Sequence, residues 1–247
     1  MPARRLTDPV IFRDGVVTAI IARRGQAERV RVYIDGSPAL DLAALVVDQA
    51  GLRCGDRLQA DRQRELYDLD SPYRARERAL RLLSLRDRSE REVERRLRQA
   101  GFAPPVVAEA LVWLRGLGYL DDRRFANTYA AEKHRVGWGP ARIRAELAAR
   151  GVERSVVDEV VATMGPRSED GAEGGTEGND VLEELVRRRF SAQFAADPEA
   201  AERRLAGYLG RRGYDWDTIG RMTRLLRVEA AGEEAPPAFL DTSSGGT

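Results

Sequence analysis

Positively charged side chains recur at helical spacing in the middle of this sequence. After Ser89, the residues Arg91, Arg95 and Arg98 repeat at the i, i+4, i+7 spacing of one helix face, while Val93 and Leu97 mark another face. A guanidinium holds phosphate or carboxylate in a planar fork and keeps its charge. With similar clusters further along the chain, these cations predict a positive stripe that fits a phosphate backbone or an acidic protein groove. The candidate contact residues are Arg86, Arg88, Arg91, Arg95, Arg98, Lys133, Arg135, Arg142 and Arg144.

The same pattern has a second interpretation, a solvated helix face balanced by acids. Glu90, Glu92 and Glu94 alternate with the arginines, and i, i+4 Glu–Arg pairs account for the spacing equally well. The 247 residues hold 41 Lys+Arg and 40 Asp+Glu, but residues 74–164 hold 19 basic and 13 acidic groups. The basic excess therefore lies in the middle of the chain.

Cysteine and histidine, which are common in zinc sites and in nucleophilic catalysis, are scarce in this sequence. A single cysteine, Cys54, and a single histidine, His134, exclude structural zinc sites built from four cysteines and histidines. The only lysine, Lys133, follows Glu132 and not the glycine of a phosphate-binding loop. The sequence therefore predicts no catalytic residue, no cofactor and no metal, and any ATP hydrolysis belongs to a partner.

Two further features are better explained by structure than by chemistry. Asp121 and Asp122 precede a helical pattern, where acids meet the positive end of the helix dipole. Trp113, Trp138 and Trp216 are not interleaved with basic residues on one strand surface, as a base-stacking sheet requires. Core packing is the expected role of Trp113, and the Trp138 loop fits either a core or a surface role.

The expected secondary structure changes from strands to helices at about the end of the first quarter of the chain. Val30, Val32 and Ile34 alternate with polar residues as in a half-buried strand, and Asp35-Gly36 is a turn dipeptide. A strand before it, a short third strand and a helix over 42–50 complete a small module. From Ser71-Pro72 onward the period is helical, so the boundary is expected at residues 62–72.

An internal repeat follows, aligned on three glycines. Gly101, Gly151 and Gly213 each lie four residues after a leucine, and another aliphatic residue precedes that leucine by four. Each copy thus has an apolar i, i+4 pair on a helix that ends at a glycine. We expect a mainly α protein in which three tandem three-helix repeats form an elongated, curved solenoid behind the N-terminal strand and helix module.

The predicted organisation has seven parts and no membrane span. The longest apolar stretches, such as residues 16–22, are too short for a signal peptide core or a bilayer span, which predicts a cytoplasmic protein. The expected parts are a flexible N-terminus (1–9), the strand and helix module (10–72), repeat 1 (73–119), repeat 2 (120–164), an acidic Gly-rich linker (165–180), repeat 3 (181–229) and a disordered tail (230–247).

Several strings in repeats 1 and 2 resemble the RecX family of recombination regulators. They are Arg88-Ser89-Glu90 with Glu92 and Leu97; Leu117-Gly118-Tyr119-Leu120-Asp121-Asp122; Phe125-Ala126; and Gly139-Pro140, Ile143, Glu146-Leu147 and Gly151. The resemblance is close over residues 73–164 and looser in repeat 3, and the segment 32–36 is similar to an extension that some members carry. The acidic insertion at 165–179 departs from the family pattern.

The resemblance implies a non-enzymatic modulator, and more specifically an inhibitor, of RecA. Such proteins bind the groove of the RecA–single-stranded DNA filament and restrain its ATPase, strand-exchange and co-protease activities in DNA repair, homologous recombination and the SOS response. It implies three three-helix repeats, RecA as partner and weak direct DNA contact. A monomer is the simplest expectation, because no long apolar heptad seam is present.

Two alternatives from other classes remain open at this point. Short helices joined by glycine turns resemble helix-turn-helix units, which would make the chain a sequence-specific DNA-binding protein. A plain scaffold would bind protein partners through its helical surface without salt-sensitive affinity for nucleic acid. The first alternative requires discrimination between duplex sites by about 10³ or more.

Overall fold

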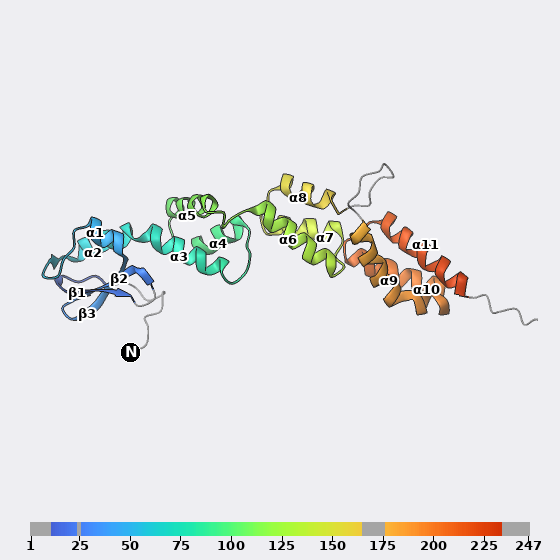
Figure 1. Ribbon diagram of the computed structural model, residues 1–247, viewed down its shortest axis with the longest axis horizontal. Coiled ribbons are helices and arrows are strands. Elements are labelled where there is room, and N and C mark those ends of the chain that lie inside the picture. Colours follow the sequence, from blue (N-terminus) through green and yellow to red (C-terminus); the bar gives the residue numbers. More distant parts are fainter. Residues whose placement is uncertain (1–10, 24–25, 165–175, 234–247) are drawn as a thin grey trace, which may run out of the picture. The chain divides into compact units, whose positions relative to one another are not determined.

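The computed structural model describes residues 11–23, 26–164 and 176–233 (Figure 1). These residues form two compact units. Unit 1 contains the residues up to Arg88 together with Glu92–Leu120, and unit 2 contains Ser89–Arg91 together with the residues from Asp121 onward. Within the described residues, no helix is long and apolar enough to cross a membrane.

Unit 1 begins with a four-stranded antiparallel sheet. Its strands are β1 (Gly15–Arg23), β2 (Gln26–Ile34), β3 (Ser37–Ala43) and β4 (Arg57–Leu58), in the order β3-β2-β1-β4. Asp35 and Gly36 both have positive φ, 48° and 75°, which suits the tight turn between β2 and β3. Val32 and Ile34 are buried, so the alternation in the sequence marks the core face as predicted.

Two helices cover this sheet, α1 (Ala44–Gln49) and α2 (Ala60–Leu69) (Figure 1). The first begins later than the expected start at Leu42, because Leu42 and Ala43 still pair with β2. The second lies across the predicted boundary at 62–72, so most of this segment is helical. It belongs to the module because Leu66 is fully buried in the same core as the sheet residues.

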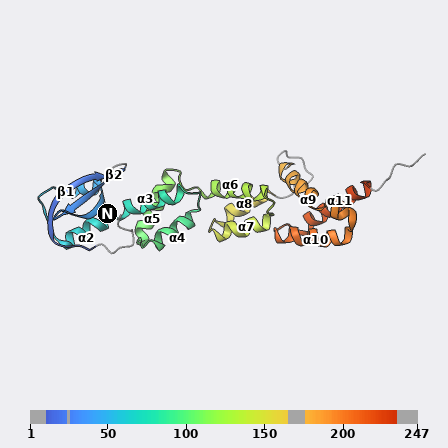
Figure 2. The same ribbon diagram turned by 90° about the horizontal axis from the view of Figure 1, so that it is seen from below.

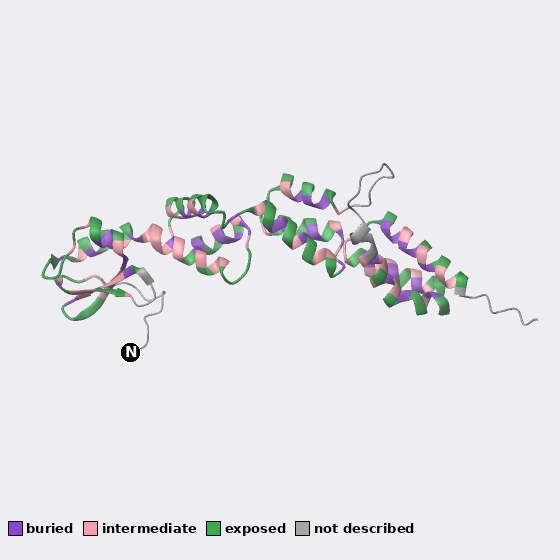
Figure 3. Cartoon of the chain, viewed as in Figure 1, coloured by how far each residue is buried: buried purple, intermediate pink, exposed green. Residues whose placement is uncertain are grey.

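Repeat 1 follows as α3 (Ser71–Leu83), α4 (Glu90–Gln99) and α5 (Pro104–Gly116), all in unit 1 except the start of α4. Its apolar pair Val93 and Leu97 is fully buried against α3 and α5. The helix α4 is followed by Gly101 with φ of +87°, a left-handed conformation that glycine adopts without strain. Figure 3 shows buried residues along the inward sides of these helices.

Unit 2 contains the other two repeats. Repeat 2 consists of α6 (Asp122–Arg135), α7 (Pro140–Ala149) and α8 (Arg154–Ala162), which lie side by side in Figures 1 and 2. Repeat 3 consists of α9 (Thr176–Ala196), α10 (Pro198–Arg211) and α11 (Trp216–Glu233). The residues aligned with Val93 and Leu97 are fully buried in both repeats, which confirms the three-helix repeat. They are Ile143, Leu147, Leu205 and Leu209.

Repeats 2 and 3 meet where two glycines bring their backbones together. The amide of Gly139 donates to the carbonyl of Arg212 at 2.7 Å, and the amide of Ala141 donates to that of Gly213 at 3.2 Å. A Cβ at Gly139 would lie 2.5 Å from the Gly213 backbone. Repeat 3 is therefore attached to repeat 2 by main-chain hydrogen bonds, and the joint admits no larger residue at Gly139.

Two helices extend into segments that were predicted to be a linker and a disordered tail. The first five residues of α9, from Thr176, belong to the linker predicted at 165–180, and the last residues of α11 extend into the tail predicted at 230–247. Helical hydrogen bonding continues past the point where apolar residues stop, which periodicity alone does not detect. The predictions for residues 1–9, 165–175 and 234–247 lie outside the described residues.

Candidate functional site

The predicted contact residues of unit 1 lie on and before α4. Arg95 and Arg98 are exposed, whereas Val93 and Leu97 are fully buried. Arg86 is also exposed and Arg88 is half-buried, both in the segment that precedes α4. The division into an apolar and a cationic face is thus observed, while the role of the cations in contacting a partner stays a prediction.

Several of these arginines are held by acceptors within unit 1. Arg86 binds Glu92 through two contacts, Nη2 to Oε1 at 3.0 Å and Nη1 to Oε2 at 3.3 Å. Arg98 Nη2 lies 2.7 Å from Glu94 Oε1. Arg88 Nε donates to the carbonyl of Leu82 at 3.0 Å, and its burial, followed by the charge of Arg86, lowers its pKa. The balanced-face interpretation therefore accounts for Arg98, which pairs with Glu94 at i, i+4 spacing. Arg86 also has an acidic partner, but Glu92 is buried and lies six residues later, so this pair is not part of a solvated helix face.

The cations of α6 and α7 in unit 2 are held differently, by aromatic rings. Arg142 Cζ lies 3.9 Å from the centroid of the Trp138 ring, and Lys133 Nζ lies 5.4 Å from the same centroid. Lys133 Nζ also lies 5.2 Å from the centroid of Tyr129, one helical turn earlier. A cation over an aromatic face is attracted by the ring quadrupole and keeps its full charge.

Local structure fixes the Trp138 loop. Gly137, with φ of +83°, follows α6, and its amide donates to the carbonyl of His134 at 2.7 Å. The Trp138 amide donates to the carbonyl of Lys133 at 3.0 Å. Trp138 is half-buried and packs against the core of repeat 2. It therefore serves the core and carries cations as well, on a helical corner and not on a strand surface.

The remaining predicted residues are not part of this arrangement. Arg144 Nε lies 3.2 Å from Asp158 Oδ1, and Arg135 is exposed in the last turn of α6. The side chain of Arg91 lies against Gly151, where an added Cβ would come within 2.5 Å of its Cβ. Of the nine predicted cations, Lys133 and Arg142 are the two that share an aromatic ring.

Sequence reasoning missed two arginines near this arrangement, Arg150 and Arg212. Arg150 Cζ lies 4.7 Å from the Tyr129 centroid. Arg212 donates from Nη1 to the carbonyls of Val136 at 2.7 Å and Gly137 at 3.1 Å, and its Cζ lies 4.5 Å from the Tyr208 centroid. The repeat alignment held a signal, because an arginine precedes both Gly151 and Gly213.

A second group of charges, in unit 1, is buried and structural. Asp70 is fully buried and accepts from Arg29 Nη1 at 2.8 and 3.1 Å and from the amide of Ala43 at 2.7 Å. Arg74 Nε lies 3.2 Å from its Oδ2. Burial raises the pKa of the Asp70 carboxyl, and the Arg29 charge opposes this rise. These bonds attach the sheet to the start of α3.

The described residues contain no group of three or more His, Cys, Asp or Glu side chains that could hold a metal ion. Asp121 is the N-cap of α6 and accepts from the Arg124 amide at 2.9 Å, and Asp122 accepts from the Glu90 amide at 2.8 Å. The structural interpretation of this acidic pair is therefore confirmed. His134 Nδ1 lies 3.3 Å from the carbonyl oxygen of Trp138, and Cys54 is exposed.

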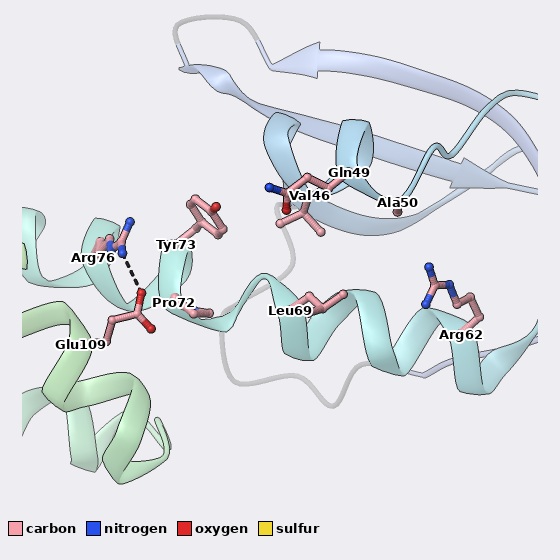
Figure 4. Close-up of a pocket in the computed structure, with 9 residues that line it drawn as sticks. All are labelled: Val46, Gln49, Ala50, Arg62, Leu69, Pro72, Tyr73, Arg76 and Glu109. Atoms are coloured by element: carbon pink, nitrogen blue, oxygen red, sulfur yellow. Dashed lines mark hydrogen bonds and ion pairs between the residues drawn. The ribbon is translucent and has the colours of Figure 1, made fainter.

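A hollow of about 270 Å³ in unit 1 lies among α1, α2, α3 and α5 (Figure 4). On one side, Arg76 Nη2 is paired with Glu109 Oε1 at 2.7 Å. The pair satisfies both charges, and the lining contains no nucleophile beside a base. This hollow therefore offers no catalytic arrangement. The lining residues are Val46, Gln49, Ala50, Arg62, Leu69, Pro72, Tyr73, Arg76 and Glu109.

The chain matches all three domains of one protein family. The first three-helix domain of RecX matches residues 75–114, the second matches residues 121–161 and the third matches residues 176–222. A crystal structure of regulatory protein RecX has a TM-score of 0.59 and 21% identity, covering 85% of this chain and 99% of that one. Another, of RecX from Lactobacillus salivarius, has a TM-score of 0.53 and 20% identity, covering 65% of this chain and 99% of that one.

Curated relatives agree with the family domains. The regulatory protein RecX of Pseudomonas syringae pv. tomato is 35% identical over 155 residues, which are 62% of this chain and 92% of the relative. The regulatory protein RecX of Clostridium acetobutylicum is 25% identical over 220 residues, which are 88% of this chain and 99% of the relative. The chain therefore belongs to the RecX family of regulatory proteins.

Proposed function

We propose that this protein regulates RecA by binding the RecA–single-stranded DNA filament and restraining its ATPase, strand-exchange and co-protease activities. The observation that carries the proposal is the match of all three RecX domains to the three helical repeats. The protein would act in the cytoplasm, as a monomer and without catalysis of its own. Its effect would be on homologous recombination, DNA repair and the SOS response.

The physical basis of this regulation is binding without reaction. Helical-repeat proteins bind partners through the exposed faces of their helices and need no catalytic group for this. Exposed cations on α4, α6 and α7 favour a negatively charged partner and make the affinity depend on salt. A bound regulator would oppose the conformational cycling or the growth of the filament.

The test is the ATPase rate of the cognate RecA on single-stranded DNA while the protein is added at substoichiometric ratios. We expect the rate to fall before one regulator is present per RecA, because one bound molecule affects several filament subunits. An unchanged rate at equimolar protein, in salt where RecA is active, would contradict the proposal. Selection from a pool of random duplexes would then test sequence-specific DNA binding, where about 10³-fold discrimination is expected.

A further inference from the structure

We propose that a surface of unit 2, the Trp138 corner, binds the backbone and bases of single-stranded DNA. The corner consists of Tyr129, Lys133, Trp138, Arg142 and Arg212. The inference rests on the proposed function and deepens it, because it names the nucleic-acid strand, and not RecA, as the partner of this surface. It also predicts that the free protein binds single-stranded DNA.

The members of the corner are joined by contacts. Lys133 Nζ lies 5.2 Å from the Tyr129 centroid and 5.4 Å from the Trp138 centroid, and Arg142 Cζ lies 3.9 Å from the Trp138 centroid. Arg212 reaches the same loop from repeat 3, where it donates to the carbonyls of the two residues before Trp138. Three cations and two aromatic rings therefore form one cluster; they come from α6, α7, the loop between these helices and the C-cap of α10.

The three cations of the corner have no ion pair with a carboxylate in the part of the chain that the structure describes. Rings hold Lys133 and Arg142, and neutral carbonyl oxygens hold Arg212, so their charges are positioned without being neutralised. A phosphate can then bind without first displacing an acid. By contrast, Arg86 and Arg98 of unit 1 would each have to leave a glutamate.

Positioning by rings also lowers the cost of binding. A long side chain loses rotamer entropy when a ligand immobilises it, and contacts made before binding reduce that loss. The guanidinium of Arg142 over Trp138 keeps its N–H edge available, because a ring face occupies only its plane. The corner is therefore preorganised for a phosphate oxygen.

The rings favour a single strand over an acidic protein or a duplex. Surfaces that bind single-stranded nucleic acid combine cations that follow the backbone with aromatic or guanidinium planes on which bases stack. Arg142 is exposed, so its outer plane can accept a base. An acidic peptide needs the cations but not the rings, and a duplex keeps its bases stacked inside.

The test measures binding of a fluorescein-labelled oligo(dT) to the full-length protein by anisotropy over a range of salt concentrations. The variant Lys133→Gln/Arg142→Gln is compared with Arg123→Gln/Arg154→Gln, whose arginines are paired with Glu159 and Asp158 in unit 2. Both variants lose two positive charges. We expect the first to lose about tenfold or more in affinity and to lower the salt slope by about 1.4, while the second stays near wild type.

A third variant separates stacking from charge. Trp138→Leu keeps every cation and removes the ring, so its affinity should fall while the salt slope stays near that of wild type. Thermal melting of each variant checks that unit 2 remains folded. Equal losses in the two double variants, or no binding of oligo(dT) by the wild-type protein at low salt, would overturn the inference.

The RecA ATPase assay distinguishes failure of this inference from failure of the proposed function. If Lys133→Gln/Arg142→Gln binds oligo(dT) normally but no longer slows RecA, the corner contacts RecA; the inference is then wrong and the proposed function stands. If the corner binds oligo(dT) as expected and the wild-type protein leaves RecA unaffected, the inference stands and the proposed function fails.

Discussion

Two arginines near α4, Arg86 and Arg98, are held differently from the cations of the Trp138 corner. Around α4, Arg86 and Arg98 are paired with glutamates of their own unit. In the corner, Lys133 and Arg142 lie against rings and keep an uncompensated charge. The same residue types at similar spacing therefore differ in their availability to a partner. What each cation contacts, and not how many cations are present, identifies the better candidate interface.

The most buried ion pair of unit 1 joins Arg29 and Asp70. Breaking it should have the largest effect on stability. Asp70→Asn removes the charge opposite Arg29, which is almost fully buried. We expect a loss on the order of 3 kcal/mol in the free energy of unfolding, because a buried charge is left partly uncompensated. Urea denaturation of the full chain measures this loss.

Asp61→Asn is the matched control for Asp70→Asn. It breaks an ion pair of the same unit between Asp61 and Arg64, both of which are exposed. Exposed pairs contribute about 0 to 1 kcal/mol. Similar losses in the two variants would mean that burial does not set the strength of carboxylate pairing in unit 1.

A substitution at the joint of repeats 2 and 3 should have the next largest effect, because this joint brings Arg212 to the Trp138 corner. Gly139→Ala places a Cβ 2.5 Å from the Gly213 backbone, where no flexible side chain can move aside. We expect the free energy of unfolding, measured by urea denaturation, to fall by about 1–3 kcal/mol. Oligo(dT) binding should weaken as well, since the hydrogen bond from the Gly139 amide to the Arg212 carbonyl would be stretched. Gly210→Ala, in α10 of repeat 3 with open space at its Cβ, is the control. If Gly139→Ala binds oligo(dT) as tightly as wild type, Arg212 does not contribute to DNA binding at the corner.

Periodicity predicted the repeats because each core position is set by local spacing. Val93 and Leu97, with their equivalents in the other repeats, are buried as the i, i+4 pattern requires. It missed α2, whose buried residues include Gln63, a polar residue that gives no apolar signal. The exposed side of a helix obeys no such rule, so the nine cations were found without their partners.

The corner itself could be predicted only in part. Lys133 and Arg142 were identified by charge, but the role of Trp138 depended on how the loop folds. Arg212 lies 70 residues after Arg142 in sequence and reaches the loop through a joint that spacing does not encode. The sequence pattern therefore does not predict which residues of different repeats contact one another.

The two groups of cations should also differ in how much their removal lowers the free energy of unfolding. Arg86→Gln removes the guanidinium that makes two hydrogen bonds to the carboxylate of Glu92, which is buried. We expect the free energy of unfolding to fall by about 1–3 kcal/mol. Arg142→Gln removes an exposed cation from a ring, which should cost below about 1 kcal/mol. Chemical denaturation of both variants compares them directly. A larger loss for Arg142→Gln would indicate that the corner stabilises the fold and does not primarily serve a partner.

The smallest expected effect comes from releasing an arginine instead of removing one. Glu94→Gln leaves Arg98 without the carboxylate that lies 2.7 Å away, so its charge becomes available to phosphate. We expect oligo(dT) affinity to rise by about two- to fivefold, in line with the small energy of a surface ion pair. Asp68→Asn, an exposed change on α2, raises the net charge equally without releasing Arg98. If both variants raise the affinity by the same amount, general attraction accounts for the gain. A larger gain for Glu94→Gln would show that the pair with Glu94 limits the binding of DNA by Arg98.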